Sequence, residues 1–242
     1  MATNLQEAKR AYDAWHGQLP VDNDTDAPWH RLLKQYLKPS LDLAGKRVLE
    51  IGCGRGGFAC WLASQPQRPS QIVAADFSAT AVQKGRAFAA EQRLSGIIWE
   101  ISDIQAIPHP DCSFDTVVSC ETIEHVIDPH RAIRELARVL KSGGRLFLTT
   151  PNYLGSLGLY RFYLWLRGRI YTEGGQPINN LTLLPITLRL VKRTGLRLRT
   201  VDAMGHYLPF PGRPPIELPI FNHPRKFMRW LGLHSLIVAQ KP

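Results

Sequence analysis

The 242-residue sequence has only four cysteines and no long uninterrupted apolar run. Its cysteines form no C-x-x-C pair, which argues against a disulfide framework and against a thiolate metal site. No stretch reaches the roughly 18 to 20 apolar residues that a membrane-spanning helix needs. The first residues lack the apolar core and the cleavage site of a secretory signal. These absences predict a cytoplasmic protein.

Acidic residues are scarce in the last third of the chain. Residues 1–152 contain 17 basic and 17 acidic side chains, whereas residues 153–242 contain 13 basic and 3 acidic ones, so the net charge of +10 belongs to this last part. Such segregation indicates either an anionic partner or surface, or a solvated basic face that aids solubility. Both interpretations stay open at this point.

Short apolar runs alternate with helical patterns through the middle of the sequence. Ser78 and Asp128 are suitable N-caps for two of the helices, and we expect Gly143 and Gly144 to end the second one. Strands that alternate with helices indicate a Rossmann-like α/β fold, with a mainly parallel sheet and helices on both faces. The expected strands are residues 47–52, 71–76, 96–102, 114–120, 145–150, 196–204 and 235–240.

One domain over residues 1–242 is the default for this length. Residues 1–43 are expected to form a helical N-terminal segment. Residues 153–180 and 206–234 interrupt the alternation of strands and helices, and we expect them to be insertions that form a lid over the functional site.

Four glycines lie within residues 52–57 of the stretch "VLEIGCGRGG". Gly52, Gly54 and Gly57 fit the pattern G-x-G-x-x-G, in which the absence of a Cβ lets a ligand approach the backbone closely. This pattern alone is weak evidence for a dinucleotide.

Three acidic residues follow the ends of three successive predicted strands. Glu50, directly before the glycines, would repel a pyrophosphate but suits a cationic or amine group. Asp76 could accept both ribose hydroxyls, and Asp103 follows the third strand, close to where an adenine would lie. Together they favour a nucleoside ligand without phosphates.

The stretches "VLEIGCGRGG", "VAADFS", "SDIQAIP" and "FDTVVSCETIEHVIDP" resemble the class I S-adenosylmethionine-dependent methyltransferases. The resemblance covers residues 44–152 closely and 181–242 loosely. It implies a seven-stranded sheet whose final, antiparallel strand is "SLIVAQ". It also implies S-adenosylmethionine as cofactor, with these residues around its methionine, ribose, adenine and sulfonium: Glu50, Gly52, Cys53, Gly54, Asp76, Phe77, Asp103, Ile104 and Cys120.

The stretch "CETIEHVID" lies where a methyl acceptor would enter, and three interpretations of Glu121, Glu124 and His125 compete. His125 could be a general base for a hydroxyl acceptor, with Glu121 beside it. All three residues could instead bind a divalent metal ion, as the similarity to ubiquinone-biosynthesis O-methyltransferases and to small-RNA 2′-O-methyltransferases implies. In the third interpretation Glu124 and His125 only brace the pocket. The RNA-enzyme pattern requires a second histidine, for which His206 is the candidate.

The segment "YLGSLGLYRFYLWLRGR", residues 153–169, is apolar nearly all round and contains Arg161, Arg167 and Arg169. Such a helix is either buried as a lid or lies at a membrane surface with its arginines at the headgroups. We therefore expect a possible membrane-surface contact through residues 153–170. Arginines and aromatic residues could also bind RNA, but no RNA-binding module accompanies them, so a nucleic-acid partner is not expected.

These features predict an enzyme that transfers a methyl group from S-adenosylmethionine to a hydroxyl of a small apolar or lipid-like acceptor. N-methylation of a small amine and metal-assisted 2′-O-methylation of RNA are the alternatives within the same class. A nicotinamide-dependent oxidoreductase and a non-catalytic cofactor-binding protein are the alternatives from other classes. The sequence carries no expectation about the oligomeric state.

Overall fold

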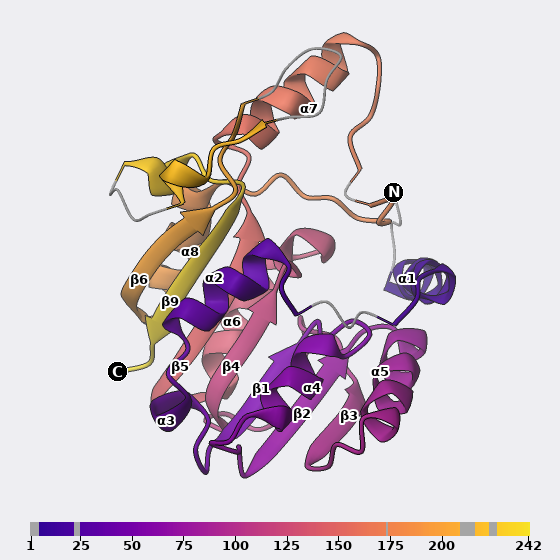
Figure 1. Cartoon of the computed structure of the whole chain (residues 1–242), viewed down its shortest axis with the longest axis vertical. Coiled ribbons are helices and arrows are strands. Elements are labelled where there is room, and N and C mark those ends of the chain that lie inside the picture. Colours follow the sequence, from indigo (N-terminus) through magenta and orange to yellow (C-terminus); the bar gives the residue numbers. More distant parts are fainter. Residues whose placement is uncertain (1–4, 22–24, 173, 209–215, 223–226) are drawn as a thin grey trace.

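The computed structural model describes residues 5–21, 25–172, 174–208, 216–222 and 227–242. Its centre is a seven-stranded sheet in the order β3-β2-β1-β4-β5-β9-β6 (Figure 1). All neighbours pair in parallel except β9, which is antiparallel to both β5 and β6. The strands are β1 (Arg47–Ile51), β2 (Gln71–Asp76), β3 (Ile97–Ile101), β4 (Phe114–Cys120), β5 (Leu140–Pro151), β6 (Arg197–Met204) and β9 (His234–Gln240). The predicted fold class, with its final antiparallel strand, is confirmed.

Helices lie on both faces of this sheet, and a short hairpin of β7 (Tyr207–Leu208) and β8 (Ile216–Glu217) lies outside it. The helices are α1 (Leu5–Gln18), α2 (Pro28–Tyr36), α3 (Pro39–Asp42), α4 (Gly57–Ser64), α5 (Ala79–Glu91), α6 (Pro129–Val139), α7 (Ser156–Leu166) and α8 (Leu184–Arg193). Three 3-10 turns complete the fold: η1 (Ile123–His125), η2 (Pro219–Phe221) and η3 (Met228–Trp230). The segment before β1 contains the helices α1, α2 and α3.

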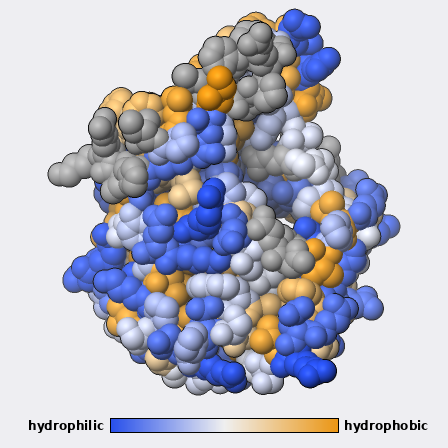
Figure 2. Space-filling model, viewed as in Figure 1, coloured by the Kyte–Doolittle hydropathy of each residue, from blue (hydrophilic) through white to orange (hydrophobic). Residues whose placement is uncertain are grey.

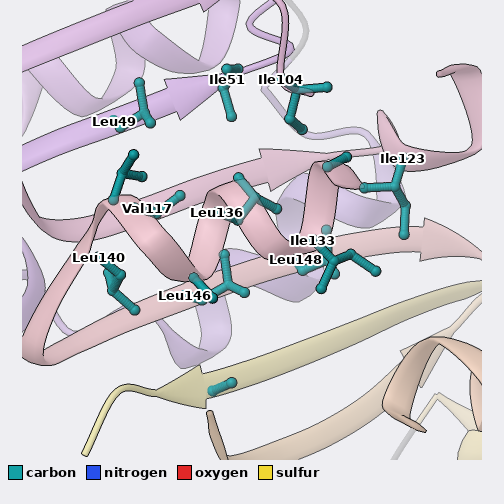
Figure 3. Close-up of a cluster of buried hydrophobic side chains, with 14 of the residues drawn as sticks. Leu49, Ile51, Ile104, Val117, Ile123, Ile133, Leu136, Leu140, Leu146 and Leu148 are labelled. Carbon is teal, nitrogen blue, oxygen red and sulfur yellow. The ribbon is translucent and has the colours of Figure 1, made fainter. Parts of the chain in front are cut away.

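Adjacent residues of each central strand point to opposite faces, and both faces are buried. Val48 packs with the cluster under α2 and α4, whereas Leu49 packs with the cluster under α6 and α8. Figure 3 shows Ile133 and Leu136 of α6 against sheet residues such as Leu146. This two-sided burial explains why the strands appear in the sequence as continuous apolar runs.

The end of α6 differs from the expectation. Gly143 and Gly144 do not end the helix, because α6 ends at Val139 and both glycines belong to β5. The pairing of β5 with β4 shifts register between Phe114 and Thr116, and Gly143 has a φ of +77°. A bulge of this kind needs a residue that tolerates positive φ, so the glycines mark an irregularity of the strand.

The predicted caps are confirmed, since Ser78 accepts from the Ala81 N–H and Asp128 from the Arg131 N–H.

The chain proceeds outward from β1 to β2 and β3 and then returns to place β4 beside β1. In open α/β sheets the carboxyl ends of two such strands flank the crevice where ligands bind. Gly52 follows β1 and Thr122 follows β4, and a Cβ on Gly52 would lie 2.1 Å from the Thr122 Oγ1. The two loops are therefore in direct contact at the switch point of the sheet.

Helix α7 projects away from the body of the fold (Figure 1). Of its side chains only Leu157 is buried, so the predicted burial of this apolar segment as a lid does not extend to most of the helix. Among the described residues, no helix combines the length and the apolar character needed to cross a membrane.

Candidate functional site

A cavity of about 510 Å³ lies at the carboxyl end of the sheet, at the switch point. Its walls come from the loops after the first four strands, from α1 and α2, from the start of β9, and from Tyr171, Gly174, Gln176 and Ile178. This volume is typical of sites for small molecules and cofactors. All nine residues that the sequence suggested for a cofactor line it: Glu50, Gly52, Cys53, Gly54, Asp76, Phe77, Asp103, Ile104 and Cys120.

The floor of the cavity is the loop after β1. Glu50 is the penultimate residue of the strand and only 3% exposed, which puts a carboxylate in the wall of the cavity. Gly52 must be glycine, because its φ of +78° and its contact with Thr122 leave no room for a side chain. A Cβ on Gly54 would instead have nothing within 4 Å, so this backbone faces open space into which a ligand could come close.

Asp76, the last residue of β2, is held in one orientation by the backbone. One carboxylate oxygen accepts from the Gly54 N–H at 2.8 Å and the other from the Ser78 N–H at 2.9 Å. Each oxygen has a second lone pair, so the carboxylate can accept two further hydrogen bonds from a diol. This arrangement suits the two ribose hydroxyls that the sequence assigned to it.

Asp103 is fixed in a similar manner, since its Oδ1 accepts from the Gln105 N–H at 2.8 Å and from Gln105 Nε2 at 3.0 Å. The Gln105 Oε1 in turn accepts from the N–H of Asp128, the cap of α6.

Burial, reinforced by nearby carboxylates such as Glu50, raises the pKa of the Cys53 and Cys120 thiols well above its usual value. Both cysteines are therefore neutral, apolar parts of the wall and poor nucleophiles.

The N-terminal helix α1 forms a wall of the cavity, which the sequence analysis missed. Asp13 accepts from the Ser78 Oγ at 2.6 Å and from the Thr80 N–H at 3.1 Å, which attaches α1 to the start of α5. Tyr12 and Trp15 extend from this helix to the loops opposite it: the Tyr12 hydroxyl donates to the His125 carbonyl, and the Trp15 indole donates to the Gly174 carbonyl. The cavity is thus closed by a helix that precedes the whole sheet in sequence.

His125 lines the cavity, but both of its ring nitrogens are bonded within the chain. Nδ1 donates to the Ile178 carbonyl at 2.7 Å, and Nε2 lies 2.9 Å from Gln176 Nε2, from which it accepts. Burial holds the pKa of this imidazole below its usual value, so the ring is neutral near pH 7. This arrangement favours the interpretation in which His125 braces the pocket by tethering residues 176–178.

Glu124 does not line the cavity. Its side chain is fully buried, and its Oε2 accepts from the Thr150 hydroxyl at 3.1 Å. In the part of the chain that the structure describes, no three His, Cys, Asp or Glu side chains converge in a way that could hold a metal ion. The predicted metal ligands Glu121, Glu124 and His125 therefore do not fit a metal centre as they lie here.

Glu121 lies at the cavity and contacts a histidine that the sequence analysis did not single out. Its carboxylate Oε2 accepts from the His234 Nδ1 at 2.9 Å. Glu121 also has a φ of +46°, a conformation that costs a non-glycine residue about 1 kcal/mol or more and that is concentrated at functional sites.

His206, the sequence candidate for a second histidine, is not part of the cavity, and it contacts Asn222 and the Met228 carbonyl.

Many of the wall residues that sequence reasoning missed come from three segments far apart in the chain. One signal was available, since "YDAWHG" and "PWH" combine aromatic residues with histidine in the predicted helical N-terminal segment. No sequence pattern pointed to His234, because a single histidine before a strand is common. In these three segments the missed wall residues are Leu5, Ala8, Tyr12, Trp15, His16, Trp29, His30, Tyr171, Gly174, Gln176, Ile178, Leu233 and His234.

Residues 49–148 match a family of proteins described as a methyltransferase domain. Ubiquinone biosynthesis O-methyltransferase from Xanthomonas oryzae pv. oryzae is 36% identical over 118 residues, which are 48% of this chain and 48% of that protein. The protein of the same name from Coxiella burnetii is 32% identical over 118 residues, 49% of each chain. The chain thus spans about half the length of the curated relatives it matches.

Solved structures resemble the whole fold at low sequence identity. An S-adenosylmethionine-dependent methyltransferase from Mesorhizobium loti has a TM-score of 0.64 at 19% identity, over 89% of this chain and 99% of that one. The [4+2]-cyclase SpnF has a TM-score of 0.67 at 20% identity, over 100% of this chain and 98% of that one. At these identities the likeness concerns the fold, and a fold of this kind supports more than one reaction.

The neutral state of His125 predicts a pH dependence of stability. The folded chain binds the proton less readily than the unfolded chain, whose histidines titrate near pH 6.5. The stabilisation is therefore present above about pH 6.5 and lost as the pH falls below it, at up to about 1.4 kcal/mol per pH unit. We expect urea unfolding to show a steeper loss of stability between pH 7 and 5.5 for the wild type than for His125→Gln. Parallel curves for the two proteins would contradict the buried, neutral imidazole.

Proposed function

We propose that the chain methylates a hydroxyl group of a small apolar or lipid-like acceptor, since residues 49–148 match the methyltransferase domain family and the chain has the fold of an S-adenosylmethionine-dependent methyltransferase. The observation that supports this proposal is the cavity at the switch point. It combines fixed carboxylates at the strand ends with an acceptor side built from aromatic and aliphatic residues. The carboxylates suit a nucleoside cofactor, and the aromatic and aliphatic residues suit an apolar methyl acceptor.

The cofactor side fits S-adenosylmethionine, which supplies an electrophilic methyl group on a positively charged sulfur when it is bound. Asp76 would hold the ribose hydroxyls, since its carboxylate is already oriented by two backbone N–H groups. Glu50 offers a buried negative charge to the amine and sulfonium end, and a pyrophosphate in its place would be repelled. Asp103 and Ile104 would face the adenine. The same charges disfavour the nicotinamide-dependent alternative.

The acceptor side is mainly apolar. Several of its residues belong to the segments that the sequence indicated as insertions, and the remainder come from the N-terminal helices. Hydrophobic walls of this kind bind apolar molecules by removing their surface from water. The names of the curated relatives, ubiquinone biosynthesis O-methyltransferases, are consistent with a hydroxylated acceptor of this class. The residues concerned include Leu5, Trp29, Leu157, Tyr171 and Leu233.

We propose that α7 contacts a membrane surface, from which a lipid-like acceptor would enter. Its exposed side chains include Phe162 (57%) and Trp165 (67%), and Ile170 just beyond it is 90% exposed. Figure 2 shows hydrophobic and hydrophilic residues side by side at the top of the molecule, where α7 lies in Figure 1. Exposed aromatic residues next to Arg167 and Arg169 are typical of helices that lie at an anionic interface. The basic excess of residues 153–242 supports the same surface.

The reaction itself is tested with the purified full chain and S-adenosylmethionine labelled in the methyl group. We expect transfer to a catechol with an alkyl tail, such as 4-hexylcatechol, in preference to small amines or to RNA. Turnover that is lost with EDTA and restored by a divalent ion would instead support the metal-assisted alternative. Binding of S-adenosylhomocysteine without transfer to any of these acceptors would support a non-catalytic cofactor-binding protein.

Asp76→Asn removes the negative charge that would accept the ribose hydroxyls but keeps the size of the side chain. We expect affinity for S-adenosylhomocysteine to fall by about 1.5–3 kcal/mol, the usual loss for a charge-assisted hydrogen bond, as measured by calorimetry. Asp26→Asn, an exposed position outside the cavity, is the matched control. Equal affinities of the wild type and Asp76→Asn would remove the ribose role.

The membrane contact is tested by co-sedimentation with vesicles of phosphatidylglycerol and phosphatidylethanolamine. Phe162→Ser combined with Trp165→Ser should weaken binding at least tenfold, because burying each aromatic side chain contributes about 1.5–3 kcal/mol. The double change Ile98→Ser and Ile101→Ser, exposed apolar residues of β3, controls for a general loss of hydrophobicity. If the wild type stays in the supernatant with these vesicles, α7 has no such role.

A further inference from the structure

We infer that Glu121 and His234 act as a carboxylate–imidazole pair in which His234 is the base that accepts the proton of the acceptor hydroxyl. This inference rests on the proposed function, because it assigns a catalytic residue to that reaction. It starts from His234, the histidine that, among the described residues, both lines the cavity and contacts Glu121. Neither His234 nor its contact with Glu121 could be expected from the sequence.

His234 is held rigidly. It is the first residue of β9 and pairs with Pro151 of β5 on one side and with Met204 of β6 on the other. Its ring lies 5.1 Å from the ring of Trp29, centroid to centroid, and the side chain is 12% exposed. The imidazole therefore has a fixed backbone, an aromatic neighbour and one open side toward the cavity.

Glu121 is held from the other wall. Its N–H donates to both the carbonyl and the hydroxyl of Thr149, which keeps the residue in its left-handed conformation at the end of β4. Its second carboxylate oxygen, Oε1, is buried and has no hydrogen-bond partner among the described residues. A strained backbone that aims a carboxylate into a cavity is a costly arrangement for packing alone, and it is characteristic of functional sites.

The contact between the two residues defines the tautomer of His234. A carboxylate can only accept, so Nδ1 carries the hydrogen and donates to Glu121 Oε2. Nε2 then bears a lone pair, and it makes no hydrogen bond to any residue that the structure describes. A carboxylate behind an imidazole both selects this tautomer and stabilises the imidazolium that forms when Nε2 takes a proton. His125 differs, because its Nε2 already accepts from Gln176.

Methylation of a hydroxyl releases one proton, and the pair of Glu121 and His234 would accept it. The acceptor oxygen forms a bond to the methyl carbon as the methyl–sulfur bond breaks, and the electron pair of that bond remains on sulfur. The hydroxyl proton moves to Nε2 of His234, and the resulting imidazolium faces the Glu121 carboxylate. The proton then leaves to solvent. The products are the methyl ether, the neutral thioether and one proton.

Methyl transfer from labelled S-adenosylmethionine to 4-hexylcatechol tests the base directly. We expect His234→Asn to lower kcat at least a hundredfold, as is usual when a general base is removed. Glu121→Gln should lower kcat at least tenfold, and Glu121→Asp should recover part of that loss. The KM for the catechol and the affinity for S-adenosylhomocysteine should stay within threefold of the wild type in all three. His130→Asn, an exposed histidine outside the cavity, should be fully active.

Nitrogen-15 NMR of histidine-labelled protein provides a second readout that needs no acceptor. His234, identified by comparison with His234→Asn, should have a protonated Nδ1 and an unprotonated Nε2. The opposite tautomer would overturn the pair. So would a His234→Asn variant whose kcat lies within threefold of an active wild type. A wild type that methylates none of the acceptors tested would instead defeat the proposed function, and with it the base, whatever the spectrum shows.

Discussion

The structure depends on the contact between the ends of β1 and β4. Gly52 and Thr122 approach so closely that even a methyl group at residue 52 would collide with the threonine. This contact exists because the chain reverses its direction of winding between β3 and β4, which makes two strands that are distant in sequence neighbours in the sheet. Glu50, Asp76, Asp103 and Glu121 all lie at this edge, so one topological feature assembles the carboxylates that line the cavity among the described residues.

The cavity is closed by segments that the sheet does not contain. Helix α1 is fixed to α5 through Asp13 and reaches across the cavity through Tyr12 and Trp15. His125 receives the first of these contacts on its carbonyl and tethers residues 176–178 with its ring. These segments are therefore attached over the cavity through a few hydrogen bonds outside the core of the sheet.

Two different surfaces meet at this site. The floor carries fixed carboxylates, whereas the segment from α7 onward is basic and exposes large apolar side chains. A cofactor with a positive sulfur suits the first surface, and an apolar acceptor from an anionic interface suits the second. The resemblance of the fold to a cyclase as well as to methyltransferases shows that the sheet alone does not determine the reaction. The proposed chemistry would depend on side chains such as Glu121 and His234, which line the cavity between these two surfaces.

Much of this arrangement was determined by the sequence alone. Apolar runs, caps at Ser78 and Asp128, and glycines after the first strand are local signals, and they predicted the fold class and nine residues that line the cavity. Local patterns fail where a contact joins residues far apart in the chain. Only the tertiary structure decided that α1 covers the cavity, that both ring nitrogens of His125 are bonded, and that Glu121 faces His234 across 113 positions of sequence. Periodicity reports which face of a strand or helix is buried, but it carries no information on which distant side chain lies opposite.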